Sequence, residues 1–76
     1  MDQKRFTVSV VIEEDADGYF AFSPELQGCY SQGKTYEEAT ANIRDAIRLH
    51  LTDRIAQHEE IPRPQSVTLS TVEVTV

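Results

Sequence analysis

The stretch Pro24–Ala46 most constrains the fold, because it joins a strand-length segment to the only long helix that the sequence predicts. Gly28 and Gly33 bracket four residues, which suffice for a strand and are too few for a helix. Thr35 then predicts a helix N-cap, and Glu38 three residues later completes a capping box. The stretch therefore predicts a short strand, a tight turn and a helix, in that order.

Two strands precede this stretch. In the first, apolar and polar residues alternate with the period of a strand that buries one face. That face comprises Phe6, Val8, Val10 and Ile12. Residues 14–18 are rich in Asp and Gly and predict a hairpin turn. The second strand, residues 19–22, is apolar on both faces, and the third strand spans residues 28–32.

The helix begins after Thr35 and presents one apolar stripe to the sheet. The stripe comprises Tyr36, Ala39, Ile43, Ala46, Ile47, His50 and Leu51. Leu49 and Ile55 fall outside it, and residues 59–64, which contain two prolines, cannot continue the helix. Residues 66–76 predict a final strand whose apolar phase changes along its length, which indicates a bulge or a strand that serves two surfaces.

These elements predict a single α+β domain over residues 1–76, with the order β-β-β-α-β and a helix on one face of one mixed sheet. The final strand is expected beside the first and parallel to it, because the helix supplies the crossover that a parallel pair requires. No second domain is expected after Val76.

Composition excludes several classes of function. Cys29 is the only cysteine, so no disulfide forms within one chain, in keeping with a reducing cytoplasm. Neither a signal peptide nor a membrane-spanning stretch is expected from the sequence. The net charge of −6 argues against direct nucleic-acid binding, which needs cations along the phosphates. It suits a basic protein partner, although acidity also serves solubility alone.

Three residue patterns suggest a metal, catalytic or phosphate-binding site, but each lacks a residue or a spacing that the site requires. The hairpin acids lack the spacing of a calcium loop, so a solvated hairpin tip is the stronger interpretation. Cys29 has no local motif that would pair it with His50 or His58 as a nucleophile, and these three residues are too few for a metal site. Lys34 and Thr35 imitate the end of a phosphate-binding loop, but the first glycine is misplaced. No cofactor is expected.

The central stretch resembles the HicB antitoxin family. In that family a Pro-x-Leu-x-Gly-Cys segment leads through a glycine turn into a Glu-Glu-Ala helix, and an Asp-Gly-Tyr segment precedes it. The matching residues are Gly18, Tyr19, Pro24, Leu26, Gly28, Cys29, Gly33, Glu38 and Ala39. The resemblance covers nearly the whole chain. It implies a partial ribonuclease H-like fold and a protein partner, HicA, a small basic toxin that cleaves mRNA with a histidine.

Many members of that family carry a C-terminal DNA-binding domain, which is not expected in this chain. The resemblance implies an antitoxin-like binding module. Catalysis is not expected, because the first strand has no internal acid to join Asp45 and Glu73 in a two-metal nuclease site. A toxin-independent oligomeric regulatory or structural domain is the alternative, and a degenerate nuclease is a distant third.

Two sets of surface residues are predicted to bind partners. The contacts with a basic toxin are Glu13, Glu14, Asp15, Asp17, Glu37 and Glu38. A homo-oligomer is also expected, because one helix covers one face of the sheet and leaves apolar side chains elsewhere. Its contacts are Leu49, Ile55, Val72 and Val74.

Overall fold

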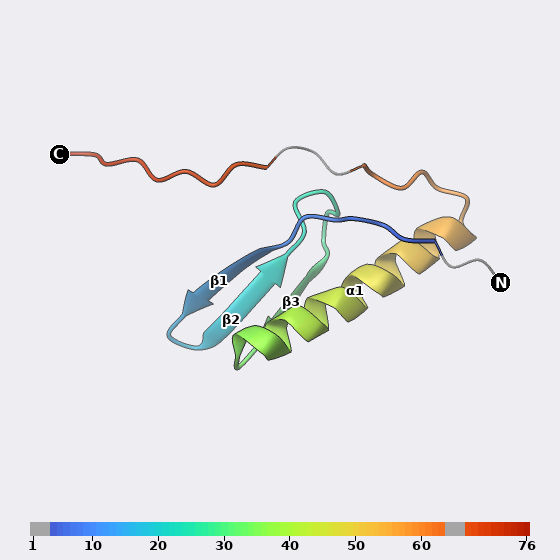
Figure 1. Cartoon of the computed structure of the whole chain (residues 1–76), viewed down its shortest axis with the longest axis horizontal. Helices are drawn as coiled ribbons and strands as arrows, with labels where there is room; N and C mark the ends of the chain where they lie inside the picture. The colour runs from blue at the N-terminus through green and yellow to red at the C-terminus, as the bar shows by residue number, and fades with distance from the viewer. Residues whose placement is uncertain (1–3, 64–66) are drawn as a thin grey trace.

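A computed structural model describes residues 4–63 and 67–76, and in these ranges the chain forms three strands and one helix. The strands are β1 (Val11–Asp15), β2 (Gly18–Phe22) and β3 (Tyr30–Gly33), and the helix is α1 (Tyr36–Ala56). They form one antiparallel sheet in the order β1-β2-β3, and α1 lies along one face of it (Figure 1). The predicted α+β class is confirmed.

The first hairpin is tighter than the sequence predicted. Asp15 pairs with Gly18 across a two-residue loop, so β1 occupies residues that were assigned to the turn. The Asp15 carboxylate accepts a hydrogen bond of 2.8 Å from the backbone N–H of Asp17 and thereby holds the loop. Gly18 has φ +133°, a conformation that favours glycine.

The predicted start of the first strand at Phe6 is wrong. β1 begins at Val11, which pairs with Phe22, the last residue of β2. After Phe22 the chain turns at Ser23-Pro24, so β2 does not extend along the residues that precede Val11. Residues 4–10 therefore have no opposite strand. Val8 and Ile12 still pack against the core, whereas Phe6 is 41% exposed and Val10 37%.

The connection between β2 and β3 folds on itself and delivers two residues to the core. Ser23 N–H donates to Cys29 C=O, Leu26 N–H to Ser23 C=O, and Cys29 N–H to Leu26 C=O. Leu26 is 1% exposed and Cys29 is 6% exposed. The Glu25 carboxylate accepts the backbone N–H of Ser9 at 3.0 Å, which ties the N-terminal segment to this loop.

The start of α1 confirms the predicted N-cap. Thr35 Oγ1 accepts the backbone N–H of Glu38 at 3.0 Å. The Glu38 carboxylate reaches one residue further back than the usual box and accepts the N–H of Lys34 at 3.1 Å. Both bonds satisfy donors at the turn between β3 and α1, so the two side chains fix where the helix begins.

The core lies between α1 and the inner face of the sheet. Its buried members are Ala21, Leu26, Cys29, Ile43 and Leu51, with Val8, Ile12, Ala46, Ile47 and Ile61 packed around them. Most of the predicted helical stripe therefore faces the sheet. Tyr36, at the first turn, is 53% exposed although its ring contacts that of Tyr19 on β2.

The end of α1 is a Schellman motif. His58 N–H donates to Ile55 C=O at 3.1 Å, and Glu59 N–H donates to Arg54 C=O at 2.8 Å. His58 adopts φ 58°, the left-handed conformation that this motif requires and that glycine usually supplies. The helix thus ends before the prolines, as the composition of residues 59–64 predicted, although Pro64 lies outside the described residues.

The predicted final strand is absent from the described part of the chain. Residues 67–76 form no strand and are exposed throughout, and Ser66 lies outside the described residues. Figure 1 shows this segment running away from the body of the protein. The sheet of the single chain is consequently antiparallel, not mixed, because the residues expected to add a parallel strand do not reach β1.

Candidate functional site: the acidic end and the aromatic face of the sheet

All six predicted acidic contacts lie at one end of the molecule, where the β1–β2 loop and the start of α1 come together (Figure 1). We call this group the acidic end; it comprises Glu13, Glu14, Asp15, Asp17, Glu37 and Glu38, all of them exposed. Two contacts bring it together. The glycines of the loop and of β3 pack closely, since a Cβ on Gly18 would lie 2.7 Å from Gly33 O. The capping interactions of Thr35 and Glu38 then set α1 beside the hairpin.

A groove of about 560 Å³ opens at this end. Its walls include Glu13, Asp15 and Asp17 from the hairpin and Glu38 from α1. Lys34 also lines it and is the one cation among its lining residues. The groove therefore presents several carboxylates to solvent within a small volume.

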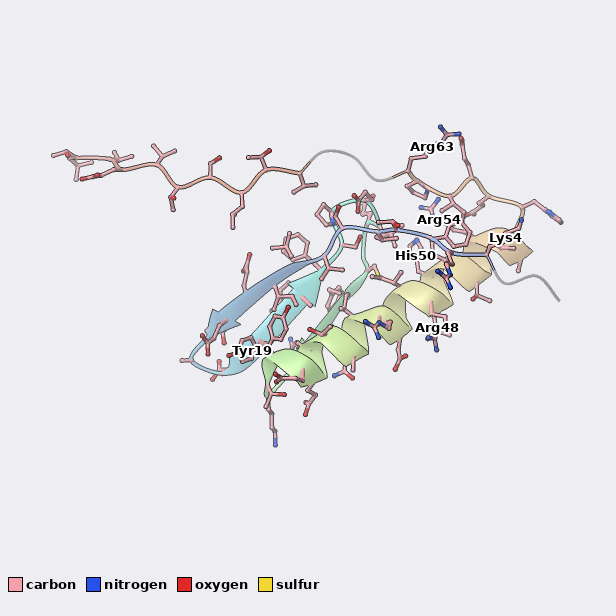
Figure 2. The ribbon with its side chains drawn as sticks, in the orientation of Figure 1. Lys4, Tyr19, Arg48, His50, Arg54 and Arg63 are labelled. Atoms are coloured by element: carbon pink, nitrogen blue, oxygen red, sulfur yellow. The ribbon has the colours of Figure 1, made fainter. Side chains whose placement is uncertain are left out.

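The other two acids of the group flank Tyr19. Glu14, its cross-strand partner, accepts a hydrogen bond from the tyrosine hydroxyl. That bond and the charge of Glu14 raise the pKa of Tyr19 above its ordinary value of 10.0, and the charge of Glu37 acts in the same direction. The Tyr19 ring meets the Tyr36 ring edge to face, with 6.4 Å between centroids. Tyr19 thus connects β2 to the first turn of α1 (Figure 2).

An aromatic cluster adjoins the acidic end on the sheet face opposite α1. Strand alternation and register place Phe20, Phe22 and Tyr30 on the same face. The Phe20 ring lies 6.0 Å from that of Phe22 and 5.8 Å from that of Tyr30, centroid to centroid. No helix or strand of the described residues covers this face, and Tyr30 is 60% exposed.

Acids border this cluster directly. Glu13 is the cross-strand partner of Phe20, so its side chain lies on the same face beside the ring. We call the combined surface the outer face; it comprises Val11, Glu13, Asp15, Phe20, Phe22, Tyr30 and Gln32. Aromatic rings attract cations over their faces, and carboxylates pair with them at the edge. This surface is therefore suited to the lysine and arginine side chains of a protein partner.

The aromatic part of this surface was not predicted from the sequence. Residues 19–22 are apolar on both faces, and that signal pointed to a second apolar surface. Which face remains uncovered depends on where α1 packs. The small Ala21, which is fully buried, lies beneath α1 and leaves Phe20 and Phe22 on the open side.

The opposite end of the molecule carries basic side chains. Figure 2 shows Lys4, Arg48, His50, Arg54 and Arg63 around the C-terminal half of α1, far from Tyr19. Lys4 and Arg48 line a second groove of about 400 Å³, whose floor includes Leu51 and Ile55. Basic side chains thus gather at this end, where the exposed acids Asp53, Glu59 and Glu60 also lie.

The structure does not assemble a catalytic group from the cysteine and histidines. Cys29 is in the core, and burial raises the pKa of its thiol, which disfavours the nucleophilic thiolate. His50 Nε2 accepts a hydrogen bond from Arg54 Nε at 2.9 Å, and His58 is exposed at the helix end. Among the described residues, no group of three or more His, Cys, Asp or Glu side chains could hold a metal ion.

The two acids considered for a nuclease site lie apart in the fold. Asp45 is on the exposed side of α1, with its carboxylate 3.9 Å from Arg48. Glu73 is in the extended segment after the helix. No helix of the described residues is both long and apolar enough to cross a membrane.

The family-motif residues of the central stretch contribute to core packing or to backbone geometry. Leu26 and Cys29 enter the core, Gly28 adopts φ +80°, and Gly33 admits the backbone of Ala39. The predicted oligomer contacts are exposed: Leu49 by 73%, Ile55 by 48%, Val72 by 81% and Val74 by 73%.

Comparison with known proteins agrees with this architecture. A UPF0150 protein of Helicobacter pylori is 45% identical over 67 residues, which cover 88% of this chain and 93% of the relative. A UPF0150 protein of Synechocystis is 46% identical over 59 residues, covering 76% of this chain and 75% of the relative. A chain of the solved HicA3 and HicB3 toxin-antitoxin complex has the same fold, with a TM-score of 0.63, 19% identity, and coverage of 79% of this chain and 72% of that chain.

The model of the family described as the HicB-like antitoxin of bacterial toxin–antitoxin systems matches residues 8–74. That match includes β1, β2, β3 and α1 in full. The chain belongs to the HicB-like antitoxin family.

Proposed function

We propose that this protein is an antitoxin that binds a small basic HicA-type toxin and prevents it from cleaving mRNA. The uncovered aromatic cluster bordered by carboxylates carries the proposal. A toxin that acts on RNA must present cations to the phosphates. The outer face and the acidic end offer aromatic rings and carboxylates to the same cations, so the protein competes with RNA for them. Both proteins then act in the cytoplasm, where mRNA is found.

Family membership and fold support this proposal independently of charge. The chain matches the antitoxin family over residues 8–74. Its fold is shared with a chain of a HicA3 and HicB3 toxin-antitoxin complex. The protein acts by binding alone in this proposal, since the cysteine and both histidines have structural or solvent-exposed positions.

The direct test mixes the purified protein with the HicA-type toxin encoded beside its gene and follows cleavage of an RNA substrate. Cleavage is expected to stop at a stoichiometric amount of antitoxin. Undiminished cleavage at an excess would overturn the proposal and favour a toxin-independent oligomeric domain. Metal-dependent cleavage by the protein alone would favour a nuclease.

The second test locates the contact. Tyr30→Ala removes an exposed ring of the outer face and is expected to weaken toxin binding by about 30-fold, as an aromatic anchor worth about 2 kcal/mol does. Leu49→Ala is the matched control, because Leu49 is similarly exposed and lies on α1 away from that face. Equal affinities for the two variants, measured by titration calorimetry, would exclude the outer face as the contact.

A further inference from the structure

Residues 67–76, which we call the C-terminal arm, include five apolar residues and are exposed throughout. Leu69 is 92% exposed, Val72 81% and Val74 73%. Figure 1 shows the arm passing the sheet and continuing beyond it. Each valine or leucine that leaves water contributes favourably to folding or binding. A segment with this composition is therefore expected to have a binding partner.

The arm has the pattern of a strand although it forms none in the single chain. In residues 71–76 the valines alternate with polar residues, so this part of the arm has one apolar and one polar face, whereas Val67 and Leu69 have the opposite phase. Valine and threonine are also the residue types that strands favour. Ten residues in extended form span about 33 Å, which is longer than β1.

One edge of the sheet is available to such a strand. β1 and β3 are the two edges, because β2 lies between them. The edge of β3 is partly occupied by α1, since Asn42 Nδ2 donates to Gln32 C=O at 2.7 Å. The described residues place no strand against the outer side of β1. The unpaired backbone groups of β1 can accept a further strand. Ile12, in β1, packs against the core, so the core extends to this edge of the sheet.

The chain completes its core without the arm. All core members and the side chains packed around them lie between Val8 and Ile61. The arm runs across the view in the same sense as β1 and yet remains separate from it (Figure 1). A terminal segment of strand-like sequence that a folded chain leaves extended, together with a vacant edge of the same sheet, is the arrangement that strand exchange between identical chains uses.

We propose that the C-terminal arm of one copy adds to the free edge of β1 in a second copy, parallel to it, and that the second copy returns its own arm in the same way. Each sheet then gains a fourth strand, which gives the β-β-β-α-β arrangement from two chains. The valine face of the arm continues the core beside Ile12, and the polar face joins the side of the sheet opposite α1. This dimer is independent of the toxin.

The test compares two double variants of the full chain that add the same charge to opposite faces of the arm. Val72→Lys with Val74→Lys is expected to raise the dimer dissociation constant by about 100-fold, because both side chains become charged at a buried face. Thr71→Lys with Thr75→Lys, the control, leaves the dimer intact. Sedimentation equilibrium measures the dissociation constants, and far-UV circular dichroism verifies that α1 persists in both.

Amide hydrogen exchange distinguishes exchange of strands from other contacts. In the wild-type dimer we expect slow exchange in residues 67–76 and in β1, and fast exchange in the arm of the valine variant. A monomeric wild-type protein with a protected arm would show that the arm folds onto its own chain. A dimer with an unprotected arm would show that another surface holds the copies together. Either result overturns the proposal.

Discussion

Gly33 and Ala39 lie so close that their backbones are in contact. A Cβ on Gly33 would be 2.9 Å from Ala39 Cα and closer still to Ala39 N. This contact seats the first turn of α1 on β3 and is reinforced by Ser31 Oγ, which donates to Ala39 C=O at 3.3 Å. The glycine of the turn is thus required by the approach of the helix. The acidic end depends on the same approach.

We predict that Gly33→Ala destabilises the fold by about 3 kcal/mol, the upper end of the range for overpacking, because the opposing atoms belong to the backbone and cannot move aside. Gly28→Ala is the control. It meets no atom within 4 Å and loses about 1 kcal/mol through its positive φ alone. Urea unfolding measures both. Rescue of Gly33→Ala by Ala39→Gly would contradict the backbone origin of the clash.

We expect Ile43→Ala to lower the free energy of unfolding by about 2–5 kcal/mol, as truncation of a core side chain does. Ile43 is 2% exposed between α1 and the sheet. Leu49→Ala, on the same helix and 73% exposed, is expected to change stability by about 0.5 kcal/mol or less. Similar losses for the two variants would mean that the buried face of α1 is assigned incorrectly.

The left-handed residue at the end of α1 offers a stabilising substitution. His58→Gly should raise the free energy of unfolding by about 0.5–1 kcal/mol, because glycine adopts φ 58° without the strain that a side chain imposes. Gln57→Gly, one residue earlier at φ −88°, should give no gain. Thermal unfolding of the two variants tests this, and a lower midpoint for His58→Gly would contradict it.

Alkaline pH should destabilise the protein through Cys29. Burial raises the pKa of the folded-state thiol above its ordinary value of 9.0, so the unfolded chain releases this proton first. The contribution is therefore fully present below that value and is lost as the pH rises through the folded-state pKa. Tyr19, whose ordinary pKa is 10.0, acts in the same direction at higher pH.

Cys29→Ala tests this assignment. It is expected to be less stable than the wild type at neutral pH, since a core side chain is shortened, and to lose less stability on going to alkaline pH. Urea unfolding at each pH measures the slope. An unchanged slope would show that the thiol does not contribute. The native thiol should also resist alkylation until the protein unfolds.

Local patterns predicted the helix and its cap, because a capping box and a 3.6-residue period are determined within one segment. Thr35 caps α1 as expected, and Ile43 and Leu51 face the sheet. Strand bounds depend on a partner elsewhere in the chain. The start of the first strand could not be predicted from its own alternation. It is set by β2, whose last residue, Phe22, pairs with Val11.

The candidate site was predicted only in part, because it too depends on contacts between segments that are distant in the sequence. The acids of the hairpin and of α1 were recognised individually as solvated and charged, but their convergence depends on the packing of Gly18 against Gly33. The aromatic cluster depends on which face of β2 the helix covers. The arm also depends on an edge of a sheet, a feature that its own sequence does not contain.

The last prediction concerns the rate at which antitoxin and toxin associate. Glu13→Lys with Asp17→Lys reverses two charges that line the acidic groove and take no part in capping α1. Association with the basic toxin should slow by about tenfold at low salt, because long-range attraction steers the encounter. The difference from wild type should shrink as salt shortens the screening length from about 10 Å at 0.1 M to about 3 Å at 1 M.

Glu59→Lys with Glu60→Lys is the matched control, since it changes the net charge equally beyond the opposite end of α1. Stopped-flow mixing over a series of salt concentrations measures both variants. A larger effect for the hairpin pair would locate the attraction at the acidic end, where Glu13 adjoins the Phe20 ring. Equal slowing by the two pairs would show that net charge alone steers the toxin, and the acidic end would then have no specific part in recognition.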